Sequence, residues 1–263
     1  MKLRFCLLLL FSVLSKYGLS QAVSSYYFRH YKDSDFLADN WVMSIAQDSY
    51  GFIWFGTHGG LSRFDGYQFR TFRYGENNPN GLGNNHIESL FLSKRNDLYV
   101  GTFSGMYVYS PSTETFGLIK GTNAMLISEI LESQSGTLYL LAAGKIYSYD
   151  TQTNLTKLIV GPERGYCVSL AISEKEILWV GTRERGLISV DLSTGKITEH
   201  DQLSEDKSGR SVVPTAIKEI KDGRLLIGTL HHGLQLYNPE KKALKTLQSS
   251  RWQIPRRYIF ARS

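Results

Sequence analysis

Apolar and polar residues alternate with a period of two through most of the chain, and the alternation breaks at clusters of turn residues. A period of two puts successive side chains on opposite faces of an extended strand, so it predicts half-buried β-strands. In the first such stretch the predicted strands cover residues 41–47, 52–57, 61–64 and 68–73. Gly, Asp and Asn fill the turns, where they accept positive φ cheaply. This pattern predicts a meander of four short antiparallel strands.

The same pattern recurs five times along the chain. Four segments share an aromatic or aliphatic pair followed by Gly-Thr, and a fifth is a degenerate copy; they begin at Trp54, Tyr99, Tyr139, Trp179 and Leu226, which are 40 to 47 residues apart. Four-stranded units at this period predict an all-β fold, a β-propeller in which each unit is one blade. We expect about five blades, at residues 41–73, 86–119, 125–159, 167–200 and 213–247.

Both ends of the chain depart from the repeat, which we assign to residues 23–250. Residues 26–31 resemble the fourth strand of a blade, of the type that closes a propeller ring. The basic tail 251–263 matches no blade feature and is too short to supply the other three strands. The sequence therefore predicts an incomplete, open ring. Its strand edges would pair with further propeller blades or cause self-association.

The amino terminus carries the features of an export signal. Lys2 and Arg4 precede an apolar run at residues 5–14, and small residues occupy positions 20 and 22. This run is shorter than the ~20 apolar residues that a membrane-spanning helix needs. We therefore predict a secretory signal peptide at residues 1–22, cleaved after Ala22, and a periplasmic location for the mature chain.

The net charge of +6 does not indicate a nucleic-acid partner. Seven basic residues and no acidic ones lie in the first 22 and last 13 positions, so residues 23–250 carry a net charge of −1. Nucleic-acid binding needs a basic face that follows the phosphate backbone, and the blades offer none. We therefore expect no nucleic-acid partner.

The first repeat resembles a known family. Residues 47–66 read QDSYGFIWFGTHGGLSRFDG, a motif similar to the two-component regulator propeller repeat. The resemblance extends over about residues 26–247 and is weakest in the third repeat, where Ala142 and Ala143 replace Gly-Thr.

This resemblance implies the periplasmic sensor region of a hybrid two-component histidine kinase, a family best known for detecting glycan breakdown products. Full members are anchored in the inner membrane and continue into further blades, a membrane helix and kinase modules, none of which is recognisable in this sequence. On this resemblance the chain corresponds to an amino-terminal fragment, a binding module without enzymatic activity.

Candidate ligand-binding residues gather on one face of the predicted propeller. In a meander, the loops between second and third strands share a face with the connections between blades, and we call this the upper face. Aromatic rings there could stack on sugars, amides could hydrogen-bond hydroxyls, and two arginines could hold a carboxylate or sulfate. The candidates are Trp41, His58, Asn84, Asn85, His86, Arg183, Arg185, His231 and His232. Alternatively, these are ordinary solvated loop residues.

Other chemistry is less well supported. His231 and His232 are adjacent, so on extended chain they point to opposite sides, and no carboxylate lies at ligand spacing. We predict no metal site and no cofactor. No catalytic motif is recognisable, although propeller enzymes assemble their sites from scattered residues. A protein-interaction scaffold and a propeller enzyme, such as a quinoprotein or a lyase, remain the alternatives to a glycan-sensing propeller.

Overall fold

The computed structural model describes residues 30–31, 36–76, 78, 80–203 and 211–247. The chain divides into two compact units, Met1–Tyr31 and Lys32–Ser263. All secondary structure described below belongs to the second unit. The predicted signal peptide (1–22), most of the predicted closing strand (26–31) and the basic tail (251–263) lie outside the described residues.

The described part of the chain forms five four-stranded antiparallel sheets, each built from consecutive strands, and we number them blades 1 to 5. Blade 1 contains β1 (Val42–Gln47), β2 (Ile53–Thr57), β3 (Gly60–Phe64) and β4 (Phe69–Phe72). Blade 2 contains β5 (Ile87–Leu92), β6 (Leu98–Thr102), β7 (Gly105–Ser110) and β8 (Thr115–Leu118). Blade 3 contains β9 (Ile127–Glu132), β10 (Leu138–Ala142), β11 (Lys145–Asp150) and β12 (Leu155–Val160).

Blade 4 contains β13 (Cys167–Ile172), β14 (Ile177–Thr182), β15 (Gly186–Asp191) and β16 (Ile197–His200). Blade 5 contains β17 (Pro214–Glu219), β18 (Leu225–Thr229), β19 (Leu234–Asn238) and β20 (Ala243–Leu247). The described helices are two short 3₁₀ turns, η2 (Pro162–Arg164) and η3 (Asp201–Leu203), and none of the described helices is long and apolar enough to cross a membrane.

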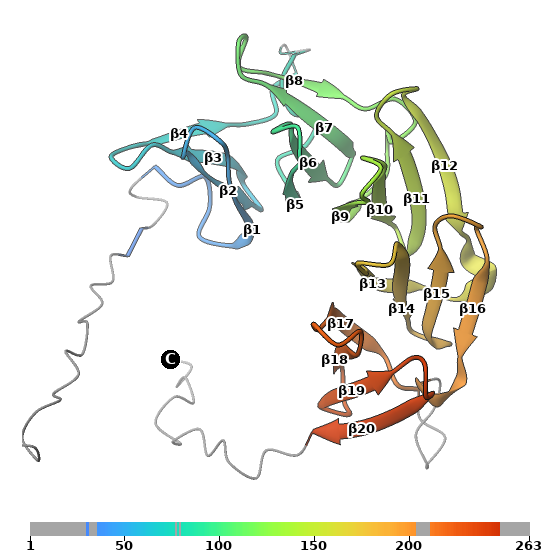
Figure 1. The fold of residues 1–263 in the computed structure, drawn as a ribbon. Helices are drawn as coiled ribbons and strands as arrows, with labels where there is room; N and C mark the ends of the chain where they lie inside the picture. The colour runs from blue at the N-terminus through green and yellow to red at the C-terminus, as the bar shows by residue number, and fades with distance from the viewer. Residues whose placement is uncertain (1–29, 32–35, 77, 79, 204–210, 248–263) are drawn as a thin grey trace, which may run out of the picture. The chain divides into compact units, whose positions relative to one another are not determined.

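The five blades follow one another in chain order, with the first strand of each blade on the inner side (Figure 1). The inner strands β1, β5, β9, β13 and β17 contact one another in that order. No described sheet combines strands from the two ends of the chain, so the blades do not close into a ring within the described residues. The predicted fold class, an all-β propeller with five four-stranded blades and an open ring, is confirmed.

Four hydrophobic clusters hold the blades together, one at each junction between consecutive blades. The cluster between blades 1 and 2 contains Trp54 and Val100, both fully buried. The cluster between blades 4 and 5 contains Trp179 and Tyr237. The two tryptophans that begin repeat segments in the sequence, Trp54 and Trp179, are therefore core residues. The core of this protein lies between its sheets, because an isolated four-stranded blade cannot bury both of its faces.

Two isoleucines at the same blade position show what a junction contributes. Ile45 is the fourth residue of β1, and Ile130 is the fourth residue of β9. Ile130 packs into the cluster between blades 2 and 3 and is 4% exposed, whereas Ile45, on the face of blade 1 that no described blade covers, is 60% exposed. Burial at this position therefore depends on a neighbouring blade.

The glycine of each Gly-Thr landmark permits the close approach of the next inner strand. A Cβ atom on Gly56 would lie 2.7 Å from Cγ2 of Ile87, and one on Gly101 would lie 2.6 Å from the carbonyl oxygen of Ile127 and still closer to Oγ of Ser89 in its own blade. Such distances are shorter than any ordinary carbon contact. On Gly228, in the last described blade, the nearest atom would be 3.5 Å away. In blades 1 and 2 the glycine therefore leaves room for the blade that follows. Blade 3 departs from this rule: the strand register places Leu141 and Ala142 at the Gly-Thr positions, and not Ala142 and Ala143 as expected from the sequence.

Hydrogen bonds between inner strands add to this packing at the third residue of each strand. The Ser89 hydroxyl donates to the Ile127 carbonyl (3.0 Å), and the Ser169 hydroxyl donates to the Pro214 carbonyl (2.7 Å). In β9 the same position holds Glu129, whose carboxylate accepts the backbone N–H of Leu170 (3.1 Å). Burial raises the pKa of Glu129 to about 7, because desolvation disfavours the carboxylate.

This shift predicts a pH-dependent stability. The folded state binds the Glu129 proton more tightly than the unfolded chain, where the pKa is near 4.5. The free energy of unfolding should therefore fall as the pH rises from about 4.5 to about 7. Glu129→Gln should remove this part of the slope and stabilise the chain at pH 8 by about 1–3 kcal/mol relative to wild type. Urea unfolding of both proteins at pH 4 and pH 8 measures the free energy of unfolding. An equal change in this free energy between the two pH values for wild type and variant would contradict the assignment.

Candidate functional site

One backbone hydrogen bond fixes the upper face in every blade. The residue directly after the second strand donates its N–H to the carbonyl of the residue directly before the first strand. This bond places the two side chains next to each other on the upper face. The five pairs, from blade 1 to blade 5, are His58 with Trp41, Phe103 with His86, Ala143 with Leu126, Arg183 with Tyr166, and Leu230 with Val213.

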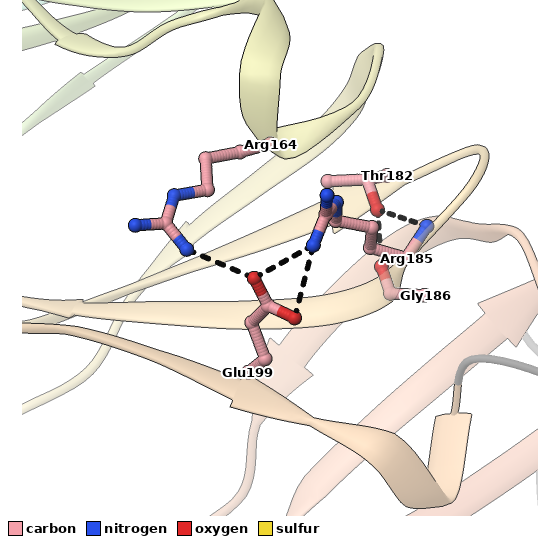
Figure 2. A network of polar contacts seen from close by, with 5 residues as sticks. All are labelled: Arg164, Thr182, Arg185, Gly186 and Glu199. Carbon is pink, nitrogen blue, oxygen red and sulfur yellow. Dashed lines mark hydrogen bonds and ion pairs between the residues drawn. The ribbon is translucent and has the colours of Figure 1, made fainter.

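The threonine of the Gly-Thr landmark shapes the loop that follows each pair. In blade 1 the Thr57 hydroxyl donates to the carbonyl of Gly60 at 2.7 Å. The corresponding bond in blade 4 runs from Thr182 to Gly186 at 3.2 Å, and the Thr182 oxygen also accepts the Arg185 N–H (Figure 2). The landmark thus holds the second-to-third loop in a tight turn and presents its side chains upward.

In blades 1 and 2 the paired rings form one continuous stack. The Trp41 and His58 rings lie 4.6 Å apart at an interplanar angle of 17°. The His86 and Phe103 rings lie 3.7 Å apart at 12°, and a tilted contact between His58 and His86, 3.8 Å apart at 43°, joins the two stacked pairs. Trp41 stays 65% exposed at the end of the stack. Three predicted site residues, Trp41, His58 and His86, are therefore brought together from two blades.

In blade 4 the two predicted arginines have different partners. The Arg183 guanidinium lies 4.7 Å from the centre of the Tyr166 ring. Arg185 donates to both carboxylate oxygens of Glu199, at 3.0 and 3.2 Å, and Arg164 adds a third bond at 2.9 Å (Figure 2). The sequence predicts that Arg183 and Arg185 hold one ligand anion together. In the structure the two guanidinium groups have different partners within the chain, Tyr166 for Arg183 and Glu199 for Arg185.

Hydrogen bonds from Arg164 and Arg185 hold the pKa of Glu199 below its ordinary value. Glu199 therefore stays ionised and masks two positive charges on the upper face near Tyr166. A cavity of about 430 Å³ opens beside this network, between blades 3 and 4, and Lys145, Tyr166 and Glu184 are among its lining residues.

The remaining predicted residues have local contacts. The Asn84 side-chain oxygen accepts the N–H of His86 (2.8 Å), and that of Asn85 accepts the N–H of Tyr74 (2.7 Å). Both asparagine side chains shape the connection between blades 1 and 2. Their amide N–H groups would be hydrogen-bond donors to a ligand. In blade 5, His231 is exposed, and His232 is fixed through its backbone to Thr229.

Two residues of this face were not selected from the sequence. Glu88, the second residue of β5, has a carboxylate oxygen 3.0 Å from Nε2 of His86. Tyr166 supports Arg183 from the position that Trp41 occupies in blade 1. The repeat itself carries the signal for Tyr166, since it directly precedes the first strand of its blade. Glu88 lies inside a strand pattern and has no such signal.

A family profile and a curated protein match parts of the chain. The profile of the family described as "Two component regulator propeller" matches residues 37–59. The protein Histidine kinase P4 of Formosa agariphila is 38% identical over 71 residues, which are 27% of this chain and 5% of that kinase. The chain therefore matches only a small part of this much longer relative.

Solved structures share the fold. Two extracellular domains of hybrid two component systems from B. thetaiotaomicron superimpose with TM-scores of 0.69 and 0.63, at 22% and 24% identity. They match 84% and 75% of this chain, which spans 32% and 27% of those domains. Virginiamycin B lyase from Staphylococcus aureus has a TM-score of 0.61 at 12% identity, covering 79% of this chain and 69% of the lyase. At these identities the likeness establishes the propeller fold alone.

The ion pairs of Glu199 with Arg164 and Arg185 predict that substitution of Glu199 exposes positive charge on the surface. Glu199→Gln should alter the free energy of unfolding by less than about 1 kcal/mol, because exposed ion pairs contribute little. It should also leave Arg164 and Arg185 without a carboxylate, so the variant should elute later from a sulfated resin at low salt.

Glu174→Gln is the matched control, since it makes the same charge change at an exposed glutamate in another loop. Equal elution of the two variants would show that Glu199 does not mask the arginines.

Proposed function

Residues 37–59 belong to the two-component regulator propeller family, and from this premise we propose that the chain acts as the ligand-sensing propeller of a two-component sensor, outside the cytoplasm. The export signal predicted from the sequence and the fold shared with extracellular sensor domains support this location. Such a module can sense a ligand only by binding it more tightly in one arrangement of the blades than in another.

We propose oligosaccharides as the ligands. The observation that carries this proposal is the stack on blades 1 and 2, which presents the exposed indole of Trp41 while His58 supports its other side. A flat aromatic ring that is held in place binds the apolar face of a sugar at little entropic cost. The side-chain N–H groups of Asn84 and Asn85 on the same blade junction would donate hydrogen bonds to ring hydroxyls.

The charges of the upper face favour a neutral sugar at this stack. His86 lies beside the Glu88 carboxylate, and the Arg73 guanidinium of blade 1 is held by the carbonyls of Ala38 and Gly59. In blade 4, Arg185 is neutralised by Glu199. An acidic sugar would gain more from Arg183, which is exposed above Tyr166. The two regions together would suit a chain that carries its charged group several units away from the stacked sugar.

We propose a binding role without catalysis. A serine and a histidine do lie within hydrogen-bond distance, since Ser189 Oγ is 2.9 Å from Nε2 of His200. Nδ1 of His200 is 2.8 Å from the Tyr237 hydroxyl, so the histidine links blade 4 to blade 5. All three residues are buried, and burial lowers the pKa of His200, which keeps it neutral. This pair serves packing, because no substrate can reach it.

Signalling would follow from binding across a blade junction. The stack joins the β2–β3 loop of blade 1 to the residue before β5 and to the β6–β7 loop of blade 2. A ligand that bridges Trp41 and Phe103 would therefore favour one angle between these blades. Further blades or other domains that pack on the open ends of the propeller would sense this change. We propose such blades as the partners of the exposed side of blade 1, where Ile45 lies.

The oligosaccharide proposal predicts a ligand-dependent melting temperature. In a panel of neutral and acidic oligosaccharides, at least one should raise Tm by about 5–10 °C at a concentration near 100 times its Kd. Trp41→Ala should abolish this rise, because it removes the stacking surface. Differential scanning fluorimetry measures both proteins.

Tyr67→Ala serves as the control, since it removes a 94% exposed aromatic ring from a turn of blade 1. A rise in Tm that survives Trp41→Ala would place the sugar elsewhere. A panel without any effect on wild type would refute oligosaccharide sensing and favour a protein-interaction scaffold.

A further inference from the structure

Three side chains that ligate metals converge at the junction of blades 1 and 2. His58 lies in the β2–β3 loop, His86 directly precedes β5, and Glu88 is the second residue of β5. One ligand atom from each lies within 4.8 Å of the others. Within this group, Nε2 of His86 is 3.0 Å from Oε1 of Glu88.

Packing holds both imidazoles in place. His58 is stacked on Trp41, and His86 is stacked on Phe103. The backbone adds to this, because the N–H of His58 donates to Trp41 and the N–H of Phe103 donates to His86. A site whose ligands are already ordered loses little entropy when it binds an ion.

The ring nitrogen of His86 lacks a suitable partner. Nε2 is buried and makes no hydrogen bond within the described residues, although a carboxylate oxygen lies 3.0 Å away. A buried polar atom without a partner is costly. A cation between the nitrogen and the carboxylate would be coordinated by both.

We propose that His58, His86 and Glu88 bind a divalent transition-metal ion, best matched by Zn²⁺. Two imidazoles and one carboxylate are typical zinc ligands, whereas Ca²⁺ and Mg²⁺ prefer oxygen ligands alone. In a tetrahedral zinc site with bonds of 2.0–2.1 Å, neighbouring ligand atoms are about 3.3 Å apart. Ligand atoms within 4.8 Å reach this spacing by small side-chain rotations.

This site does not depend on the oligosaccharide proposal. Three protein ligands leave a coordination position open, and all three residues are partly exposed, so the ion reaches the site from solvent. The ion connects a loop of blade 1 to the inner strand of blade 2. Zinc should therefore raise the stability of the chain through preferential binding to the folded state.

Zinc titration of the full chain tests the proposal. After treatment with a chelator, calorimetry should show one Zn²⁺ bound per chain. His58→Phe and His86→Phe remove a ligand but keep an aromatic ring in the stack, and Glu88→Gln keeps the side-chain size. Each substitution should weaken binding by more than the roughly 10- to 100-fold that loss of an outer-shell partner costs. His231→Phe, which removes an exposed histidine of blade 5, should leave zinc binding unchanged.

A second measurement needs no variant. Zn²⁺ should protect His58 and His86 of the wild-type chain from modification by diethyl pyrocarbonate, while His231 reacts at the same rate with and without the ion; mass spectrometry of peptides reports each site. The proposal is overturned if wild type takes up no zinc, if uptake survives both histidine substitutions, or if zinc protects neither His58 nor His86. Because the His58→Phe and His86→Phe variants keep Trp41 and the stack, their sugar binding tests the oligosaccharide site separately.

Discussion

The close approach of one inner strand to the glycine of the preceding blade is the contact on which this structure depends. Gly101 leaves room for the carbonyl of Ile127, and Gly56 leaves room for the side chain of Ile87. This approach brings the serine and glutamate side chains of the inner strands within hydrogen-bond distance of the next blade. It also allows the hydrophobic clusters to form between sheets. Stability is consequently a property of neighbouring blades rather than of any single blade.

The upper face follows from the same repeat. Each Gly-Thr landmark ends a strand, its threonine closes the next loop, and a backbone bond pairs the side chains on both sides. The paired positions are free to vary, because they lie above the core. Blades 1 and 2 use them for aromatic rings, and blade 4 uses them for Tyr166 and Arg183. A conserved geometry thus carries different chemistry in each blade, which is how a propeller presents a binding site without changing its fold.

Much of the fold could be predicted from the sequence, because the same pattern of strands and turns recurs in each blade. The predicted strands of blade 1 differ from β1 to β4 by at most one residue at each end. The meeting of Trp41, His58 and His86 also followed from the rule that these loops share a face. Two features were out of reach: the bond between Arg185 and Glu199 joins the β14–β15 loop to β16, and the position of Glu88 beside His86 depends on side-chain direction within β5. Such contacts depend on rotamers and register, which periodicity alone does not fix.

The stability of two alanine variants, measured by urea unfolding, tests the role of blade contact most directly. Gly56→Ala places a Cβ against the Ile87 side chain of the next blade and should destabilise the chain by about 1–3 kcal/mol. Gly228→Ala occupies the same blade position with room to spare and should be neutral or stabilising by up to about 1 kcal/mol. Equal losses of stability in the two variants would contradict the account, because the glycine would then serve its own blade rather than the approach of the next one.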